Sequence, residues 1–148
     1  MDNWRTPPEI FIKLDTEFYF DLDAAASAEN ALCSKFLTDA LRVEHWPGWR
    51  IFLNPPYGKM LAPFIRKAAA EAEKDKTIVA LIPLRMRAAW FHDYVIGKAV
   101  EVRAVRKRIK FLRPDGTRPQ LTGSCDSMII VWQGPFSGET KLTSWSYE

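Results

Sequence analysis

At residues 50–58 the chain reads RIFLNPPYG, a short apolar run followed directly by two prolines. Residues 50–53 predict a buried strand, because β-branched and aromatic side chains fit a pleated sheet that is covered on both faces. Proline has no amide hydrogen to donate to a sheet, so the strand must end before Pro55. The stretch therefore predicts a strand that runs straight into a rigid loop at 54–58.

Helical and strand-like patterns alternate on both sides of this stretch. Apolar residues at helical spacing predict helices at 7–18, 61–72 and 88–96, and an alanine-rich run predicts another at 24–29. Short apolar runs predict further strands at 19–23, 78–82, 100–105, 109–111 and 127–132. Strands that alternate with helices indicate a three-layer α/β fold around a mostly parallel sheet.

The composition excludes several classes of protein. With 148 residues, of which 47% are hydrophobic and 26% charged, residues 1–148 are expected to form one globular domain. The longest apolar run, at 77–83, is too short to cross a membrane. Cys33 and Cys125 match no zinc or disulfide spacing, and His45 and His92 are isolated, so we expect reduced thiols, no metal site and a cytoplasmic location.

Positive charge is concentrated in one part of the chain. Residues 83–119 contain ten Lys or Arg against three Asp or Glu, whereas the rest of the chain is slightly acidic. Such a basic stretch attracts polyanions by counterion release and by long-range steering, although a solvated surface has the same composition. The residues that we expect to contact a nucleic acid are Arg85, Arg87, Arg106, Lys107, Arg108 and Lys110.

Polar residues follow two of the predicted strands. Asp21 and Asp23 end the strand at 19–23, and Asn54 follows the strand at 50–53. In an open parallel sheet, ligands bind outside the carboxyl ends of the strands. The sequence therefore predicts a polar binding site at this edge.

The tetrapeptide at 54–57 suits chemistry on an exocyclic amine. Such an amine is a poor nucleophile, because its lone pair is delocalised into the base. The side-chain oxygen of Asn54 and the carbonyl of Pro55 can accept both amine hydrogens, and the two prolines, Pro55 and Pro56, hold that carbonyl in a fixed direction. Tyr57 offers a flat face for a base that has left its stack.

Four segments in this order resemble a known family. They are Trp4-Arg5-Thr6-Pro7, the run from Phe20 to Ser27, Asn54-Pro55-Pro56-Tyr57-Gly58 and Arg108-Ile109-Lys110-Phe111. Together they are similar to the phage-type DNA N6-adenine methyltransferases, the small Dam-like family. The resemblance spans residues 4–132 and implies a Rossmann-like αβα methyltransferase fold with an antiparallel C-terminal strand.

The resemblance also implies an activity and a set of site residues. The activity is direct in-line transfer of a methyl group from S-adenosyl-L-methionine to N6 of adenine in DNA, leaving S-adenosyl-L-homocysteine. Asn54, Pro55, Pro56 and Tyr57 would form the adenine site. The cofactor site would contain Trp4, Thr6, Pro7, Asp21, Asp23, Ala24, Ala25 and Asp39. No glycine precedes Gly48, so small alanine side chains replace the usual glycine-rich loop.

Alternatives remain at the level of residues and of substrate. Thr6 either caps the first helix, followed by proline and closed by Glu9, or contacts the cofactor. The same tetrapeptide also suits methyl transfer to adenine in RNA or to another amino group. A further alternative is a nucleic-acid-binding relative that has lost catalysis. The partner is expected to be adenine-containing DNA, duplex or single-stranded, read by loops at 83–92 and 106–124 without a separate target-recognition domain. Both a monomer and a homodimer fit the sequence.

Overall fold

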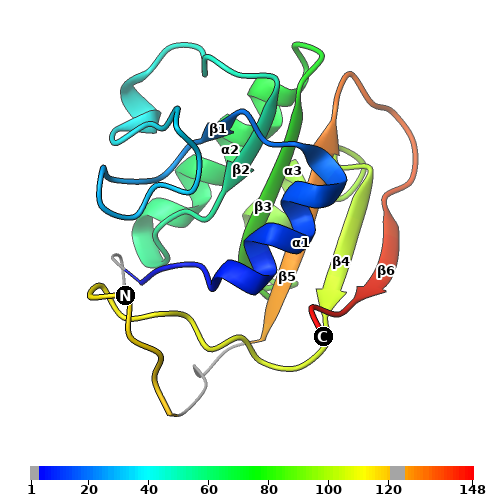
Figure 1. The fold of residues 1–148 in the computed structure, drawn as a ribbon. Helices are drawn as coiled ribbons and strands as arrows, with labels where there is room; N and C mark the ends of the chain where they lie inside the picture. The colour runs from blue at the N-terminus through cyan, green and yellow to red at the C-terminus, as the bar shows by residue number, and fades with distance from the viewer. Residues whose placement is uncertain (1–3, 121–125) are drawn as a thin grey trace.

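The computed structural model describes residues 4–120 and 126–148, and in that part of the chain six strands form one mixed sheet with three α-helices (Figure 1). The elements follow in the order α1 (Pro8–Phe18), β1 (Leu22–Asp23), β2 (Arg50–Leu53), α2 (Leu61–Ala72), β3 (Thr77–Pro83), α3 (Ala89–Tyr94), β4 (Glu101–Val105), β5 (Ser127–Gln133) and β6 (Lys141–Trp145), with short 3₁₀ helices at Ala40–Arg42 and Gly58–Met60. Cys33 is a half-buried thiol, and Cys125 lies outside the described residues.

The sheet has the strand order β1-β2-β3-β5-β4-β6. β1, β2 and β3 pair in parallel, and β4 pairs in parallel with β6. β5 is antiparallel to both of its neighbours, β3 and β4. Five of the six strands therefore point the same way, and their carboxyl ends lie along one edge of the sheet.

The antiparallel strand is the predicted strand at 127–132, which is β5 and lies inside the sheet between β3 and β4. It is not the last strand of the chain, because the parallel β6 follows it. β6 was not predicted from the sequence, because only one of its side chains, Trp145, is buried, whereas Leu142 is 63% exposed. An edge strand that is covered on one face carries little apolar signal.

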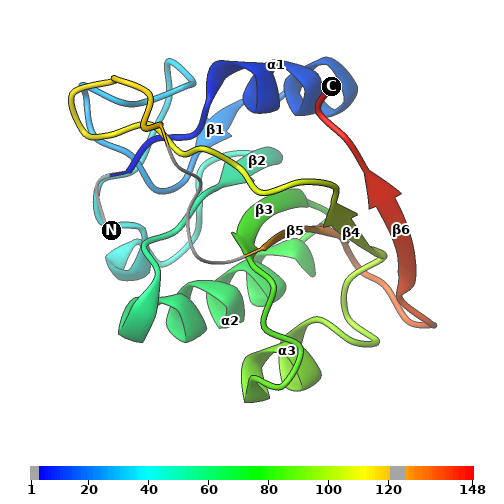
Figure 2. The same ribbon diagram turned by 90° about the horizontal axis from the view of Figure 1, so that it is seen from below.

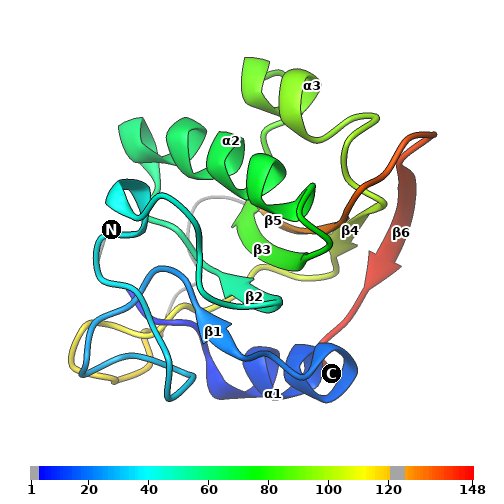
Figure 3. The same cartoon turned by 90° about the horizontal axis from the view of Figure 1, so that it is seen from above.

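Helices lie on both faces of the sheet, as Figures 2 and 3 show with α1 on one side and α2 and α3 on the other. Successive side chains of a strand point to opposite faces, so Ile51 and Leu53 pack with α2 whereas Phe52 packs with α1. The predicted apolar face of α1 (Ile10, Phe11, Leu14 and Phe18) is buried, as is that of α2. These two clusters hold β2 between them and fix the position of the loop that follows it.

Two predicted elements are absent from the described residues. The run at 24–29 is a loop and not a helix, because its backbone bonds elsewhere: the Ala26 N–H donates to Leu37 O at 3.0 Å, and Asp23 pairs with Phe36 in a parallel bridge. The predicted strand at 109–111 is irregular as well. Next to it, Leu112 forms an isolated antiparallel bridge with Arg5, which ties the segment after β4 to the start of the chain.

The long connection between β1 and β2 is braced by one buried carboxylate. Glu71, near the end of α2, is 1% exposed and accepts hydrogen bonds from the Trp46 N–H at 2.6 Å, Lys76 Nζ at 2.9 Å and Lys74 Nζ at 2.6 Å. The Trp46 indole N–H donates to Ala40 O at 3.0 Å. The lysines hold the pKa of Glu71 at about 2 despite its burial. This network fixes the part of the connection near residue 40.

Candidate active site

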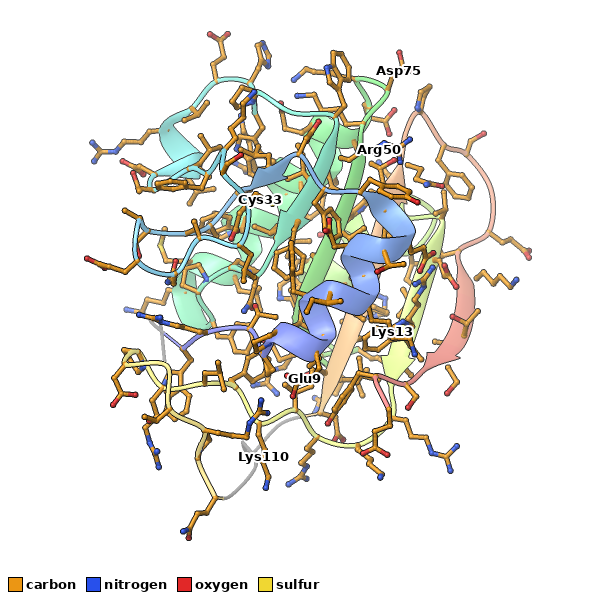
Figure 4. All side chains as sticks on the ribbon, in the orientation of Figure 1. Glu9, Lys13, Cys33, Arg50, Asp75 and Lys110 are labelled. Atoms are coloured by element: carbon orange, nitrogen blue, oxygen red, sulfur yellow. The ribbon has the colours of Figure 1, made fainter. Side chains whose placement is uncertain are left out.

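The ends of β1 and β2 bring the predicted polar residues together. Asp23 is the last residue of β1 and stands opposite Phe52 of β2 in parallel register. The Ala24 N–H donates to Phe52 O at 2.9 Å, so the chain leaves β1 beside the point where Asn54 leaves β2. Arg50 and Asp75, in contrast, lie at the opposite end of the sheet from Glu9 and Lys110 (Figure 4).

A cavity of about 430 Å³ opens at this edge, within the usual size range of small-molecule sites. Eight of the predicted site residues line it, and they are Trp4, Thr6, Asp23, Ala24, Ala25, Asp39, Asn54 and Pro56. Its wall is therefore built from the start of the chain, the loops after β1 and β2, and the braced connection near residue 40.

In the described part of the chain, the other predicted site residues do not line this cavity. The Asp21 carboxylate is at the far end of β1, where it accepts hydrogen bonds from the Trp49 N–H at 3.0 Å and the Arg50 N–H at 3.1 Å. Pro7, directly before α1, and Pro55, in the loop after β2, are both buried. Tyr57 is half-buried and lies edge-on to Phe111, with ring centroids 6.3 Å apart.

Several residues of the wall were not singled out from the sequence. They are Arg5, Ala26, Ser27, Asn30, Leu32, Thr38, Ala40, Leu41, Phe52, Met60 and Phe64. Arg5, Ala26 and Ser27 stand within or beside the segments that carry the resemblance, which is a usable signal. The residues from 30 to 41 come from an irregular connection whose path no periodic pattern specifies.

Asp23 is the buried charged group of the cavity. It is 3% exposed, and its carboxylate accepts hydrogen bonds from the Leu32 N–H at 3.1 Å and the Ala25 N–H at 3.4 Å. Burial raises the pKa of Asp23 to about 6, and the two backbone hydrogen bonds offset only part of that effect. A buried carboxylate on a cavity wall is suited to a ligand that brings positive charge or hydroxyl donors.

Asn54 is held by a side chain that lies 48 residues earlier in the chain. Its Nδ2 donates to the Thr6 hydroxyl oxygen at 2.8 Å. The expectation that Thr6 caps the first helix is wrong, because Pro7 occupies the cap position and no side-chain hydrogen bond caps α1. The amide group has two different ends, so engaging its nitrogen leaves Oδ1 to accept from another donor.

The predicted DNA-contacting residues follow the strand ends along the same edge. Arg85 and Arg87 come directly after β3 and are exposed, and Arg106 begins the segment after β4. Two members of the set form ion pairs within the chain, Lys107 with Glu148 at 2.7 Å and Arg108 with Asp126 at 3.2 Å. A second cavity of about 370 Å³ separates part of this segment, including Lys110, from the start of α1.

Residues 4–120 and 126–148 contain no group of three or more His, Cys, Asp and Glu side chains that could hold a metal ion. Among the same residues, none of the helices has the length and apolar character that a membrane crossing needs.

Comparison with known proteins gives a family and two phage relatives. The family described as DNA N-6-adenine-methyltransferase (Dam) matches residues 1–147. A DNA N-6-adenine-methyltransferase of Escherichia phage T1 is 37% identical over 96 residues, which cover 62% of this chain but only 40% of the phage protein. A protein of the same name from Haemophilus phage HP1 is 31% identical over 138 residues, covering 89% of this chain and 79% of its own length. The chain therefore belongs to the Dam family of DNA N-6-adenine-methyltransferases.

Proposed function

We propose that this chain transfers a methyl group from S-adenosyl-L-methionine to the N6 amine of adenine in DNA. The observation that carries the proposal is Asn54, which follows β2 on the wall of the 430 Å³ cavity with its amide nitrogen bonded to Thr6. Membership of the Dam family and the names of the two phage relatives point to the same reaction. Helices on both faces of a largely parallel sheet favour a Rossmann-like methyltransferase fold.

The cavity fits the proposed cofactor. Ala24 and Ala25 leave room for close approach to the end of β1, and the Asp23 carboxylate suits the ammonium or ribose hydroxyls of S-adenosyl-L-methionine. Trp4 and Asp39 lie on the same wall, where a ring and a carboxylate suit an adenosine. When bound there, the cofactor supplies a methyl group on a positively charged sulfur.

The contribution of the protein to the reaction is positioning. Asn54 Oδ1 and the Pro55 carbonyl accept the two hydrogens of N6, which draws the amine lone pair out of conjugation and toward the methyl group. Pro56 restricts the backbone on which that carbonyl stands. Tyr57, held edge-on by Phe111, presents a ring against which the extruded base stacks. As N6 gains the methyl group it loses one proton to water, and S-adenosyl-L-homocysteine is released.

The basic edge supports a nucleic acid as the substrate. Arg85 and Arg87 follow β3, the neighbour of β2, and Arg106 follows β4 farther along the same edge of the sheet. From there they can hold phosphates while a base is turned outward. We propose that the chain acts as one methyltransferase domain and works in the cytoplasm of a host cell. Loops at 83–92 and 106–120 contribute to the choice of target sequence. The second loop was predicted to extend to residue 124, and residues 121–124 lie outside the described residues.

The test is methyl transfer from labelled S-adenosyl-L-methionine, followed by nucleoside mass spectrometry of the product. Unmethylated duplex DNA, its single strand and an RNA of the same sequence are offered separately and then in competition. N6-methyladenine in DNA supports the proposal. Product in RNA alone would mean that the substrate is RNA and not DNA. If DNA is bound but no product forms with any of the three substrates, the chain is a catalytically silent relative.

A further inference from the structure

Thr6 occupies an unusual position for a threonine next to a helix start. It is 6% exposed, lies two residues before α1, and bonds to Asn54 instead of capping the helix. A threonine in this place ordinarily satisfies backbone N–H groups of the first turn. Here that turn begins with prolines, and the hydroxyl is turned toward the loop after β2.

We propose that Thr6 is a positioning residue that sets the orientation of the Asn54 amide for the reaction. The inference rests on the proposed function, because it assigns a role in amine recognition. The last torsion of an asparagine side chain has a broad and nearly two-fold energy profile. The side chain alone therefore does not decide which way its oxygen and its nitrogen point. With Nδ2 held by Thr6 at 2.8 Å, Oδ1 is directed away from Thr6 and is presented to the hydrogens of N6.

The opposite orientation cannot serve the reaction. It would place the NH₂ group of Asn54 against the amine of adenine, so that donors would face donors and the amine would lose an acceptor. In the structure the atom that bonds to the buried Thr6 hydroxyl is Nδ2, so Oδ1 is the atom of the amide that is left for the amine hydrogens. The reaction therefore depends on a residue that lies 48 positions from Asn54 in the sequence.

The backbone next to Thr6 is fixed independently of Asn54. The Arg5 N–H donates to Leu112 O and the Leu112 N–H donates to Arg5 O, both at 2.8 Å. In the first turn of α1, Glu9 forms an ion pair with Arg118 through two bonds of 2.8 and 3.2 Å. The chain on both sides of Thr6 is thus tied to the segment that follows β4, and this gives Asn54 a fixed partner to bond to.

The experiment compares Thr6→Val, which keeps the shape and removes the hydroxyl, with Thr6→Ser, which keeps the hydroxyl. Thr16→Val is the matched control, because Thr16 is an exposed threonine on α1 whose hydroxyl bonds only locally, to Ile12 O at 2.8 Å. The measurements are kcat, KM for S-adenosyl-L-methionine and the calorimetric Kd for S-adenosyl-L-homocysteine. The ¹⁵N-labelled side-chain amide signal of Asn54, assigned by its loss in Asn54→Ala, adds a readout that needs no activity.

Thr6→Val is expected to lower kcat by roughly tenfold or more, because the Asn54 amide nitrogen loses its buried hydrogen-bond partner. KM and Kd are expected to stay within about twofold. The Asn54 amide signal should move and exchange faster with solvent. Thr6→Ser should recover most of the rate and the signal. If Thr6→Val is unfolded at the assay temperature, Thr6→Ala is used with the same criteria.

Three results would overturn the proposal: an unchanged kcat in Thr6→Val, an equal loss in Thr6→Ser, or a loss confined to KM and Kd. The last result would place Thr6 at the cofactor instead of at Asn54. Failure of the proposed function looks different, because the natural chain and Thr16→Val would then both form no N6-methyladenine. The Asn54 amide signal would still decide whether Thr6 orients that side chain.

Discussion

Replacement of Asp23 by asparagine should stabilise the protein while weakening its site. The carboxylate is 3% exposed, and its pKa is raised from 3.8 to about 6 in the folded chain. The folded state therefore holds a proton between these values that the unfolded state has already lost. Stability from this group falls as the pH rises through that window, and the loss reaches about 3 kcal/mol above pH 6.

Asparagine removes the charge but keeps one acceptor oxygen. Of the two backbone donors to Asp23, from Leu32 and Ala25, one loses its partner, which costs about 1 kcal/mol. The net gain is about 2 kcal/mol at pH 7, or roughly 4 to 8 °C in Tm for a chain of this size. At pH 4 and below, Asp23 is protonated as well and only the cost of the lost hydrogen bond remains, so Asp23→Asn should there be less stable than the natural chain by about 1 kcal/mol.

The assay is thermal unfolding followed by circular dichroism from pH 4 to pH 8, without cofactor. Asp93→Asn, an exposed substitution on α3, is the control and should shift stability by less than about 0.5 kcal/mol at every pH. A lower Tm for Asp23→Asn at pH 7, or a difference that does not depend on pH, would refute the reasoning. Calorimetry with S-adenosyl-L-methionine should show weaker binding to the same variant, because the anionic acceptor is gone.

Two further predictions concern the brace of the cavity and the basic edge. Glu71→Gln should destabilise the fold by about 3 to 5 kcal/mol in urea unfolding, because the 6% exposed Lys76 ammonium loses its charged partner; a loss below 1 kcal/mol would contradict the brace. Its low pKa also predicts that this stabilisation is present above pH 4.5 and is lost as the pH falls toward 2. Arg106→Ala should reduce the slope of log K against log salt for duplex DNA by about one unit. Arg66→Ala, an exposed arginine on α2, should leave that slope unchanged, and equal slopes for both variants would remove Arg106 from the phosphate contacts.

The elements around the Asn54 loop could be predicted because their signals are local. The strand at 50–53 has the predicted bounds, and β3 and α2 agree with their apolar patterns. Proline marks the ends of β2 and β3 in the sequence, and the structure ends both strands there. Residues close to one another in the sequence were sufficient to predict these elements.

Other features depend on partners that are distant in the sequence. The alanine run at 24–29 has helical composition, but the backbone around it bonds to residues 35–37 and forms a loop. β6 is a strand because β4 offers it an edge, not because its side chains are apolar. Thr6 has the sequence context of a helix cap, yet its hydroxyl bonds to Asn54.

The sequence indicated residues of the cavity wall more completely than their arrangement in space. Strand ends and the resemblance together identified eight residues of the cavity wall. Asp21 carries the same chemical signal as Asp23, but Asp21 precedes the two-residue strand β1 whereas Asp23 ends it. Strand length, which the sequence analysis overestimated, decides which carboxylate reaches the carboxyl edge.

The central claim is that Asn54 carries the transfer of a methyl group to adenine. The most direct measurement compares N6-methyladenine formed in unmethylated duplex DNA by the natural chain and by Asn54→Ala, with S-adenosyl-L-homocysteine affinity and Tm measured on both. The account predicts N6-methyladenine from the natural chain, a loss of at least a hundredfold in Asn54→Ala by the usual weight of a preorganised acceptor, and little change in affinity or Tm. Equal product from both proteins, or none from the natural chain while it still binds DNA and cofactor, would contradict it.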